Sequence, residues 1–376
     1  MNSEELPGLY IHVPFCRSKC LYCDFYSVAS RAAVPEWLHA VQSEILHYKD
    51  RFSRFDSLFL GGGTPAILEE KQLGELFECL HKHFTFAPES EMTMEANPDG
   101  LSREKLKAVW DLGINRISLG VQSLDDTDLK FLGRSHNSGQ ALEALDTIRS
   151  CGFENISADL IYGLETQTLG GWKRKVDRIL EFKPEHLSCY QLTLEKGTPL
   201  WKMKEAGRIR PIGEKLQSAF FIWTSRYLER NGYIHYEVSN FARGRKFMCR
   251  HNRKYWSHVP YLGLGPSAHS FHSGSRWWNV RSIGKYCKLL EEGKPPVEGS
   301  EVLTPEQLEL ETLDLGLRTS DGVDMHALGS GLKVEEALGK LQKMGLAKLK
   351  DGRIQPTRKG FLVADGLPLM FYGGQD

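Results

Sequence analysis

Hydrophobic residues along the first 240 positions alternate between two periods. Short apolar runs typical of strands occur at 8–13, 56–60, 91–95, 116–121, 156–162 and 186–193. The stretches between them carry apolar residues at helical spacing, in four stripes: Trp37, Val41, Ile45 and Tyr48; Leu73, Leu76, Phe77, Leu80 and Phe84; Leu142, Leu145 and Ile148; Trp172, Val176, Ile179 and Leu180. This alternation predicts an α/β fold with a parallel sheet and helical crossovers. Six such units fit a partial or full (β/α)6 barrel, in which chemistry sits where the strands end.

The pattern weakens after residue 240, which predicts three segments: 1–240, 241–296 and 297–376. Residues 243–278 are rich in Gly, His, aromatic and basic residues and predict loops and short strands packed on the barrel. The sequence EGKPP at 292–296 predicts a linker. Thr304 and Gln307 then have the spacing of a capping box that opens a helix. A second helical stripe and an Asp351-Gly352 turn follow, so the tail predicts a small α+β domain resembling a winged helix.

Composition and charge narrow the class of protein. The chain is 41% hydrophobic and 26% charged, and 48 basic residues balance 48 acidic ones. A net charge of zero gives no support to a nucleic-acid partner, and the basic residues of the tail are interleaved with acids. No apolar run approaches the roughly 18 residues of a membrane span, and the first residues do not read as a secretory signal. We therefore expect a cytoplasmic protein whose eight cysteines stay reduced.

Three of these cysteines, Cys16, Cys20 and Cys23, fall within eight positions, directly after the first predicted strand. Zinc is one candidate for such a motif, but it prefers four ligands and paired CxxC units. Three thiolates on a [4Fe–4S] cluster leave one iron without a protein ligand. The amino and carboxylate groups of a methionine can chelate that iron. We therefore predict a [4Fe–4S] cluster with S-adenosylmethionine at its open iron, where electron transfer into the sulfonium would cleave a C–S bond.

The CxxxCxxC motif resembles that of the radical S-adenosylmethionine (radical SAM) superfamily, and the flanking motifs resemble the oxygen-independent coproporphyrinogen oxidase family within it. In chain order these motifs are YIHVPFC from Tyr10, GGGTP from Gly61, EANP from Glu95, GVQS from Gly120, DLIYGL from Asp159 and GLGPS from Gly263. They run in family order from residue 8 to residue 271, and the tail is similar to the family's carboxyl-terminal module. The resemblance implies a radical SAM barrel followed by that module.

The resemblance also implies roles for single positions. Residues meeting the amino-acid end of S-adenosylmethionine would be Gly62, Gly63 and Thr64, and those holding its ribose hydroxyls would be Glu95, Gln122 and Asp159. Arg134 would pair with the ligand carboxylate, and Tyr10 would lie beside the cluster. The residues themselves leave simpler alternatives open: a tight turn for the glycines, helix caps for the acids, a surface salt bridge for Arg134 and core packing for Tyr10.

Three features depart from coproporphyrinogen oxidase. That enzyme carries a fourth cysteine two residues after the third, and Phe25 stands at this position. The cluster motif begins at residue 16, so the long amino-terminal segment that helps to enclose the oxidase's substrate is not expected. The chain also contains His251-Asn252-Arg-Lys-Tyr255-Trp256, an HNxxYW signature similar to that of the HemW-type heme chaperones.

The chemistry of this signature suits heme. His251 would ligate the iron through an imidazole nitrogen, and Tyr255 and Trp256 would stack on the porphyrin. Three basic neighbours would meet the propionates: Arg250, Arg253 and Lys254. The alternatives are a packed, hydrogen-bonded histidine in a loop, and Cys249 as a second candidate ligand.

Two functions follow from the resemblance. The first is a heme chaperone that passes heme to acceptors such as respiratory cytochromes in membranes, with the cluster and S-adenosylmethionine in a supporting role. We assign it no catalytic residues and expect no coproporphyrinogen oxidase activity. The alternative is a radical enzyme that oxidatively decarboxylates the propionates of coproporphyrinogen III. The oligomeric state stays open, with a homodimer as one option.

Overall fold

A twelve-stranded mixed sheet organises the computed structural model, which describes residues 5–329 and 332–372. The strand order is β12-β11-β10-β9-β1-β2-β3-β4-β5-β6-β8-β7. Seven neighbouring strands are parallel: β9 (Tyr261–Leu264), β1 (Gly8–Val13), β2 (Arg54–Gly62), β3 (Thr85–Ala96), β4 (Arg116–Gln122), β5 (Ile156–Tyr162) and β6 (His186–Gln191). Residues 1–4, at the start of the first predicted segment, lie outside the described residues. So do residues 330–331 and 373–376, which belong to the third.

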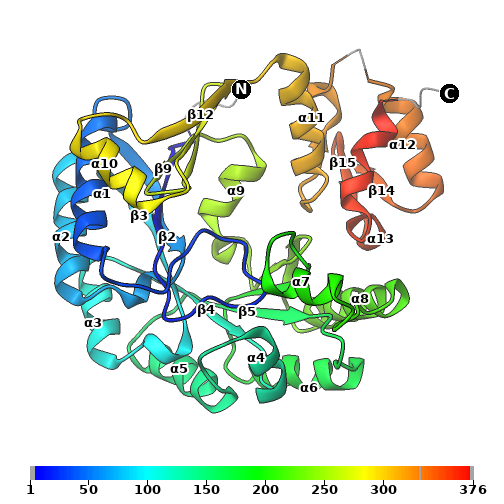
Figure 1. Ribbon diagram of the computed structural model, residues 1–376. Helices are drawn as coiled ribbons and strands as arrows, with labels where there is room; N and C mark the ends of the chain where they lie inside the picture. Colours follow the sequence, from blue (N-terminus) through cyan, green and yellow to red (C-terminus); the bar gives the residue numbers. More distant parts are fainter. Residues whose placement is uncertain (1–4, 330–331, 373–376) are drawn as a thin grey trace.

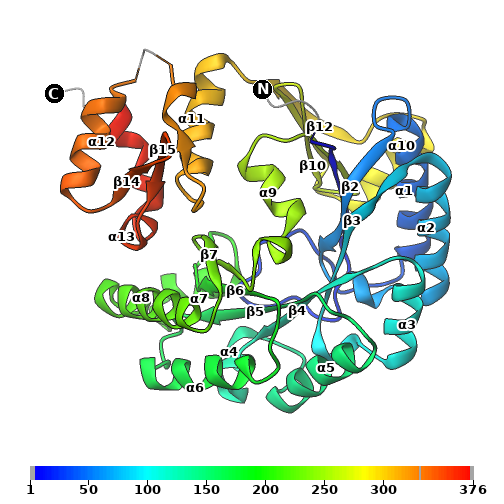
Figure 2. The ribbon, with the colours of Figure 1, turned by 180° about the vertical axis from the view of Figure 1, so that it is seen from behind.

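Helices cover the outer face of this sheet, as both ribbon views show (Figures 1 and 2). They are α1 (Val34–Tyr48), α2 (Glu70–His83), α3 (Arg103–Asp111), α4 (Asp126–Leu132), α5 (Ser138–Ser150), α6 (Leu169–Leu180), α8 (Glu214–Arg230) and α10 (Ile283–Glu291). The short helix α7 (Pro199–Glu205) instead contacts the cysteine loop (residues 16–27), because the Leu200 N–H donates to the Leu21 carbonyl (3.0 Å). The sheet does not close, because β12 (Val297–Val302) and β7 (Ile234–Glu237) are its two edges. The prediction of a partial barrel is therefore confirmed. Across the described ranges, no helix combines the length and hydropathy needed to cross a membrane.

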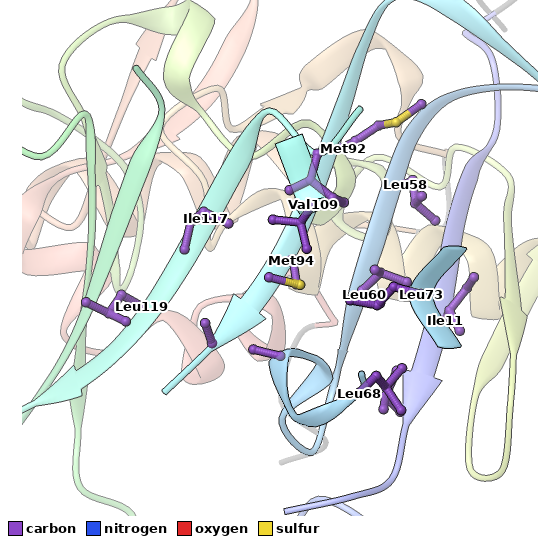
Figure 3. Packing of buried hydrophobic residues seen from close by; sticks show 14 of the residues in the cluster. Ile11, Leu58, Leu60, Leu68, Leu73, Met92, Met94, Val109, Ile117 and Leu119 are labelled. Carbon is purple, nitrogen blue, oxygen red and sulfur yellow. The ribbon is translucent and has the colours of Figure 1, made fainter. Parts of the chain in front are cut away.

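Side chains alternate between the two faces of the central strands. Leu58 and Leu60 on β2, like Met92 and Met94 on β3, point outward and pack with residues such as Leu73 of α2 (Figure 3). On β2 to β6 the alternate positions face inward and are mostly polar. They include Ser57, Glu91, Thr93, Glu95, Arg116, Ser118, Ser157, Asp159, His186 and Ser188. The predicted strands therefore have an apolar outer face and a polar inner face, and the site lies on the inner one.

The segment after residue 240 contributes more regular structure than its pattern predicts. Strands β8 (Asn240–Ala242), β10 (His269–His272) and β11 (Ser275–Asn279) join the sheet in antiparallel pairs. The HNxxYW signature lies on a short helix, α9 (Arg250–Trp256), on the inner side of the sheet (Figures 1 and 2). The Glu91 carboxylate accepts hydrogen bonds from the backbone N–H groups of Arg250 (2.8 Å) and His251 (3.4 Å). Because the capping carboxylate belongs to β3, the sequence next to α9 contains no capping residue that would predict the start of this helix.

The tail forms a small domain with its own core. It contains α11 (Pro305–Gly316), β13 (Val323–Asp324), α12 (Val334–Lys343), the hairpin β14 (Ala347–Lys350) and β15 (Arg353–Pro356), and α13 (Arg358–Phe361). The predicted turn is present, because Asp351 and Gly352 both have positive φ between the paired hairpin strands. Strand β12, just after EGKPP, pairs with β11 in the large sheet, and the first helix of the small domain begins at Pro305.

Glu44 of α1 is a buried carboxyl that joins the helix to the carboxyl-terminal part of the sheet. It accepts hydrogen bonds from Gly265 N (2.8 Å), Asn279 Nδ2 (2.6 Å) and Tyr286 Oη (2.6 Å). Burial raises the pKa of this carboxyl from 4.5 to about 7. The unfolded chain loses the proton near pH 4.5 and the folded chain near pH 7. The contribution of Glu44 to stability therefore falls as the pH rises through this window.

We expect Glu44→Gln to remove this contribution, which amounts to about 3 kcal/mol between the two pKa values. The measurement is the free energy of unfolding in denaturant for variant and wild type at about pH 4.5 and about pH 7.5. The difference between the two proteins isolates Glu44, because the other titrating groups are common to both. Parallel pH profiles for the two proteins would contradict the prediction.

Candidate functional site

The cysteine loop is held at both of its ends. Phe15, at the end of β1, forms a parallel bridge with Val28. The Cys16 N–H donates to the Val28 carbonyl (3.0 Å), and the Val28 N–H donates to the Pro14 carbonyl (2.8 Å). Phe15 itself is fully buried, with its ring edge-on to Trp37 at 5.7 Å. Residues 16–27 thus form a loop clamped at the carboxyl end of the first barrel strand.

All three cysteines of the loop are half-buried free thiols. Burial raises the pKa of the Cys16 thiol, and it raises that of Cys23 to about 11. Nowhere in the described ranges do three His, Cys, Asp or Glu side chains gather around one metal-ion position. The loop offers three thiolates, which is the number of protein ligands that a four-iron cluster with one open iron takes, whereas structural zinc usually takes four.

Arg134 is a cation in direct contact with the cysteine loop. Its Nη1 lies 3.4 Å from both Cys20 Sγ and Tyr22 Oη, and its Nη2 donates to Asn97 Oδ1 and to the Gly120 carbonyl. Its Nε has no hydrogen-bond partner, and within the described residues the guanidinium makes no ion pair. A buried cation without a carboxylate fits a site that receives an anionic group, such as cluster thiolates or the carboxylate of a methionine. The surface salt bridge considered from sequence is not what the structure contains.

The GGGTP segment runs beside the cysteine loop. Thr64 Oγ1 donates to Cys16 Sγ (3.7 Å) and accepts from Asn97 Nδ2 (3.1 Å). A Cβ on Gly63 would lie 2.6 Å from the Phe15 carbonyl oxygen, and Gly62 has φ +101° with the His12 ring against it. The glycines are thus required by close packing within the protein itself. Gly62 and Gly63 also line the cavity described below.

The polar residues expected at the strand ends gather on the same inner face. Glu95 accepts from the Gly62 N–H (3.1 Å), and burial together with Asp159 raises its pKa to about 8. Asp159 accepts from the hydroxyls of Ser118 and Ser157, and burial raises its pKa as well. Gln122 has φ +62°, a conformation that is uncommon outside glycine and often marks a functional site. None of the three caps a helix in the structure.

A cavity of about 1230 Å³ opens on the inner face. It extends from Cys23 in the cysteine loop, past the inner face of the sheet, to the 361–366 segment of the small domain. The predicted site residues in its lining are Tyr10, Gly62, Gly63, Glu95, Gln122, Arg134, Asp159, His251 and Cys23. Thr64, Cys16 and Cys20 are not among the lining residues; Thr64 contacts Cys16, and Cys20 contacts the lining residue Arg134. The volume exceeds the roughly 300–1,000 Å³ of usual ligand pockets.

The HNxxYW helix contributes only some of its residues to the cavity. His251, Asn252 and Tyr255 line it, whereas the other residues of the signature region do not: Arg250, Arg253, Lys254 and Trp256. His251 is buried, with Nδ1 3.3 Å from Ser57 Oγ and Nε2 2.8 Å from Tyr255 Oη. Burial lowers its pKa to about 3. The packed, hydrogen-bonded histidine considered from sequence is the state that the structure contains, on a helix instead of a loop.

Two residues of the site had no role in the sequence analysis. Asn97 connects Thr64 to Arg134 by side-chain hydrogen bonds, and its position directly before Pro98 in the EANP motif was the available signal. Arg116 is 2% exposed and lines the cavity, although it begins a strand that reads as apolar. A charged residue at an inward position of a buried strand was the signal there.

Comparison with known proteins gives concordant results for the whole chain. Residues 10–179 match the Radical SAM superfamily and residues 303–363 match the HemN C-terminal domain. The heme chaperone HemW of Bacillus subtilis is 34% identical over 380 residues, covering 98% of this chain and 100% of that protein. The heme chaperone HemW of Synechocystis is 36% identical over 338 residues, covering 87% and 82%. The coproporphyrinogen III oxidase HemN of Escherichia coli shares the fold, with a TM-score of 0.83 at 23% identity, over 98% of this chain and 91% of that one.

Proposed function

This chain belongs to the HemW heme chaperone family of the radical SAM superfamily, and from this membership we propose that it binds heme and delivers it to acceptor proteins. The cavity is the observation that carries the proposal. Its volume of about 1230 Å³ leaves space beyond one ligand at the cysteine loop. Aromatic side chains line it, among them Tyr26, Phe59 and Tyr255, which suits a flat apolar macrocycle.

The proposal includes a [4Fe–4S] cluster on Cys16, Cys20 and Cys23, with S-adenosylmethionine at its open iron. Arg134 supports it, because this cation contacts Cys20, has a buried Nε without a partner, and makes no ion pair with any described residue. The cluster would supply reducing electrons when bound. The chain's own part is to hold the ligand: Gly62, Gly63 and Thr64 at its amino-acid end, with Tyr10 close by, and Glu95, Gln122 and Asp159 at the ribose.

The proposed place of action is the cytoplasm, and the proposed acceptors are respiratory heme proteins, including membrane-bound ones. All eight cysteines are free thiols, which supports a reducing compartment. A homodimer stays a prediction from sequence.

An anaerobic titration of the reconstituted protein with ferric heme tests the function, with the Soret absorbance as readout. We expect saturable binding near one heme per chain and no decarboxylation of coproporphyrinogen III by the same preparation. His251→Ala belongs in the titration, because the signature predicts His251 as iron ligand. Weak, unsaturable heme binding together with decarboxylase activity would reject the chaperone function and support the alternative, a coproporphyrinogen oxidase.

A further inference from the structure

Four histidines line the cavity, and they differ in what their ring nitrogens already bind. His12 is bonded to Tyr10 Oη (2.9 Å) and the Tyr26 carbonyl (2.8 Å). His186 is bonded to Ser157 Oγ (2.8 Å) and Tyr236 Oη (2.7 Å). Together with His251, these residues are at most 3% exposed and use both nitrogens. For any of them, binding a metal would mean giving up an internal hydrogen bond in a buried position.

His269 is the exception. It begins β10 and its side chain is exposed to the cavity, and within 5–329 and 332–372 neither of its ring nitrogens has a hydrogen-bond partner. The ring lies 6.1 Å from that of its cross-strand partner Trp278, at an interplanar angle of 26°. Stacking orients the imidazole without occupying its nitrogens. Partial burial and the charge of Arg276 lower the pKa of His269, which keeps the ring in the neutral form that coordinates iron.

Other residues that line the same cavity suit the two other parts of a heme. Phe25 and Tyr26 line the same cavity, and Phe25 is 68% exposed, so that it offers apolar surface to a macrocycle. Arg281 also lines the cavity; among residues 5–329 and 332–372 its polar partner is the exposed Asp24, at 3.5 Å from the carboxylate, and its side chain is 52% exposed. A guanidinium in this position can take a propionate carboxylate.

We propose that His269, instead of His251, supplies the protein ligand to the iron of the bound heme, with Phe25 against the porphyrin and Arg281 at a propionate. This inference rests on the proposed function and specifies where in the cavity heme binds. His251 then has a structural role: its hydrogen bond with Ser57 fixes α9 to β2, and Tyr255 of the same helix occupies its other nitrogen.

The test compares His269→Ala, His272→Ala and His251→Ala with the wild type in the anaerobic titration with ferric heme. We expect His269→Ala to weaken heme binding at least about tenfold and to move the Soret maximum, with both effects partly reversed by added imidazole. The control is His272→Ala, because His272 lies on the same strand outside the cavity lining, with Nδ1 3.4 Å from Arg51 Nη2. This variant should bind heme as the wild type does. Since His269 is exposed, its replacement should leave the unfolding midpoint unchanged.

The outcomes separate this inference from the proposed function. If the wild type does not bind heme saturably, the proposed function fails and the inference fails with it. If the wild type binds but His269→Ala keeps its affinity and spectrum, the inference alone is overturned. Loss of the wild-type spectrum in His251→Ala, at an unchanged melting temperature, would assign the ligand to His251 instead.

Discussion

Replacing any one of Cys16, Cys20 and Cys23 by alanine is expected to lower the iron content of the anaerobically reconstituted protein from about four atoms per chain to near zero. The loop that carries them is clamped to β1 by the bridge between Phe15 and Val28. No other cysteine lies within it, so a lost ligand has no substitute on the loop. The broad absorbance of the cluster near 400 nm should disappear together with the iron.

The controls for this prediction are Cys79→Ala and Cys151→Ala. Both thiols are half-buried against the barrel core and lie outside the cavity lining. These variants should keep the full iron content. Metal analysis also separates cluster from zinc, since one zinc and no iron in the wild type would reject the cluster. Full iron content in all three loop variants would equally contradict the assignment.

Gly63→Ala is expected to destabilise the protein by about 3 kcal/mol and to abolish binding of S-adenosylmethionine. The added Cβ would lie 2.6 Å from the Phe15 carbonyl oxygen and 2.7 Å from that of Val13. These are backbone atoms at the end of β1, and the Gly63 N–H already donates to Val13 (2.8 Å). Either the end of β1 or the GGGTP segment must move. Both lie against the cysteine loop, because Cys16 follows β1 and Thr64 contacts Cys16. Denaturant unfolding and equilibrium dialysis with S-adenosylmethionine measure the two effects.

Gly74→Ala is the matched control. Gly74 lies inside α2, where an added Cβ would meet no atom within 4 Å. Alanine exceeds glycine in helix propensity, so this variant should gain up to about 1 kcal/mol. Both variants add one methyl group to a glycine, but the expected changes in the free energy of unfolding have opposite signs. If Gly63→Ala were as stable as the wild type, the GGGTP segment would be able to move away from β1. Close packing against β1 would then not explain why this position is a glycine.

Several elements could be predicted from sequence because their signals are local. The six barrel strands, the four helical stripes and the Asp351-Gly352 hairpin were all recognised, since period and turn chemistry involve residues close in the chain. Helices α3, α4, α7, α8 and α10 were not singled out. Four of these helices span seven or nine residues, too few for a clear stripe, whereas α8 spans 17 residues and its stripe was missed. Helix α9 was missed as well, because its cap is Glu91, more than 150 residues away.

The site divides in the same way. The cysteine spacing and the motifs at the strand ends identify residues without any knowledge of the fold, and the structure brings most of them to one cavity. What each side chain faces could not be predicted. Arg134 was assigned to a ligand carboxylate and also lies beside Cys20, and the glycines pack against β1. These contacts join separate barrel strands and loops.

The sequence by itself determined the family, the alternating barrel and the three cysteines, because each depends on residue types at short, fixed spacings. Only the tertiary structure shows which histidines of the cavity already use both ring nitrogens in hydrogen bonds. The signature suggested His251, but Ser57, which is 194 positions away, and Tyr255 occupy its nitrogens. His269 belongs to no such signature; it pairs with Trp278 across β10 and β11, and its side chain is exposed. A side chain's hydrogen bonds depend on its neighbours in space, and folding brings those neighbours from distant parts of the chain.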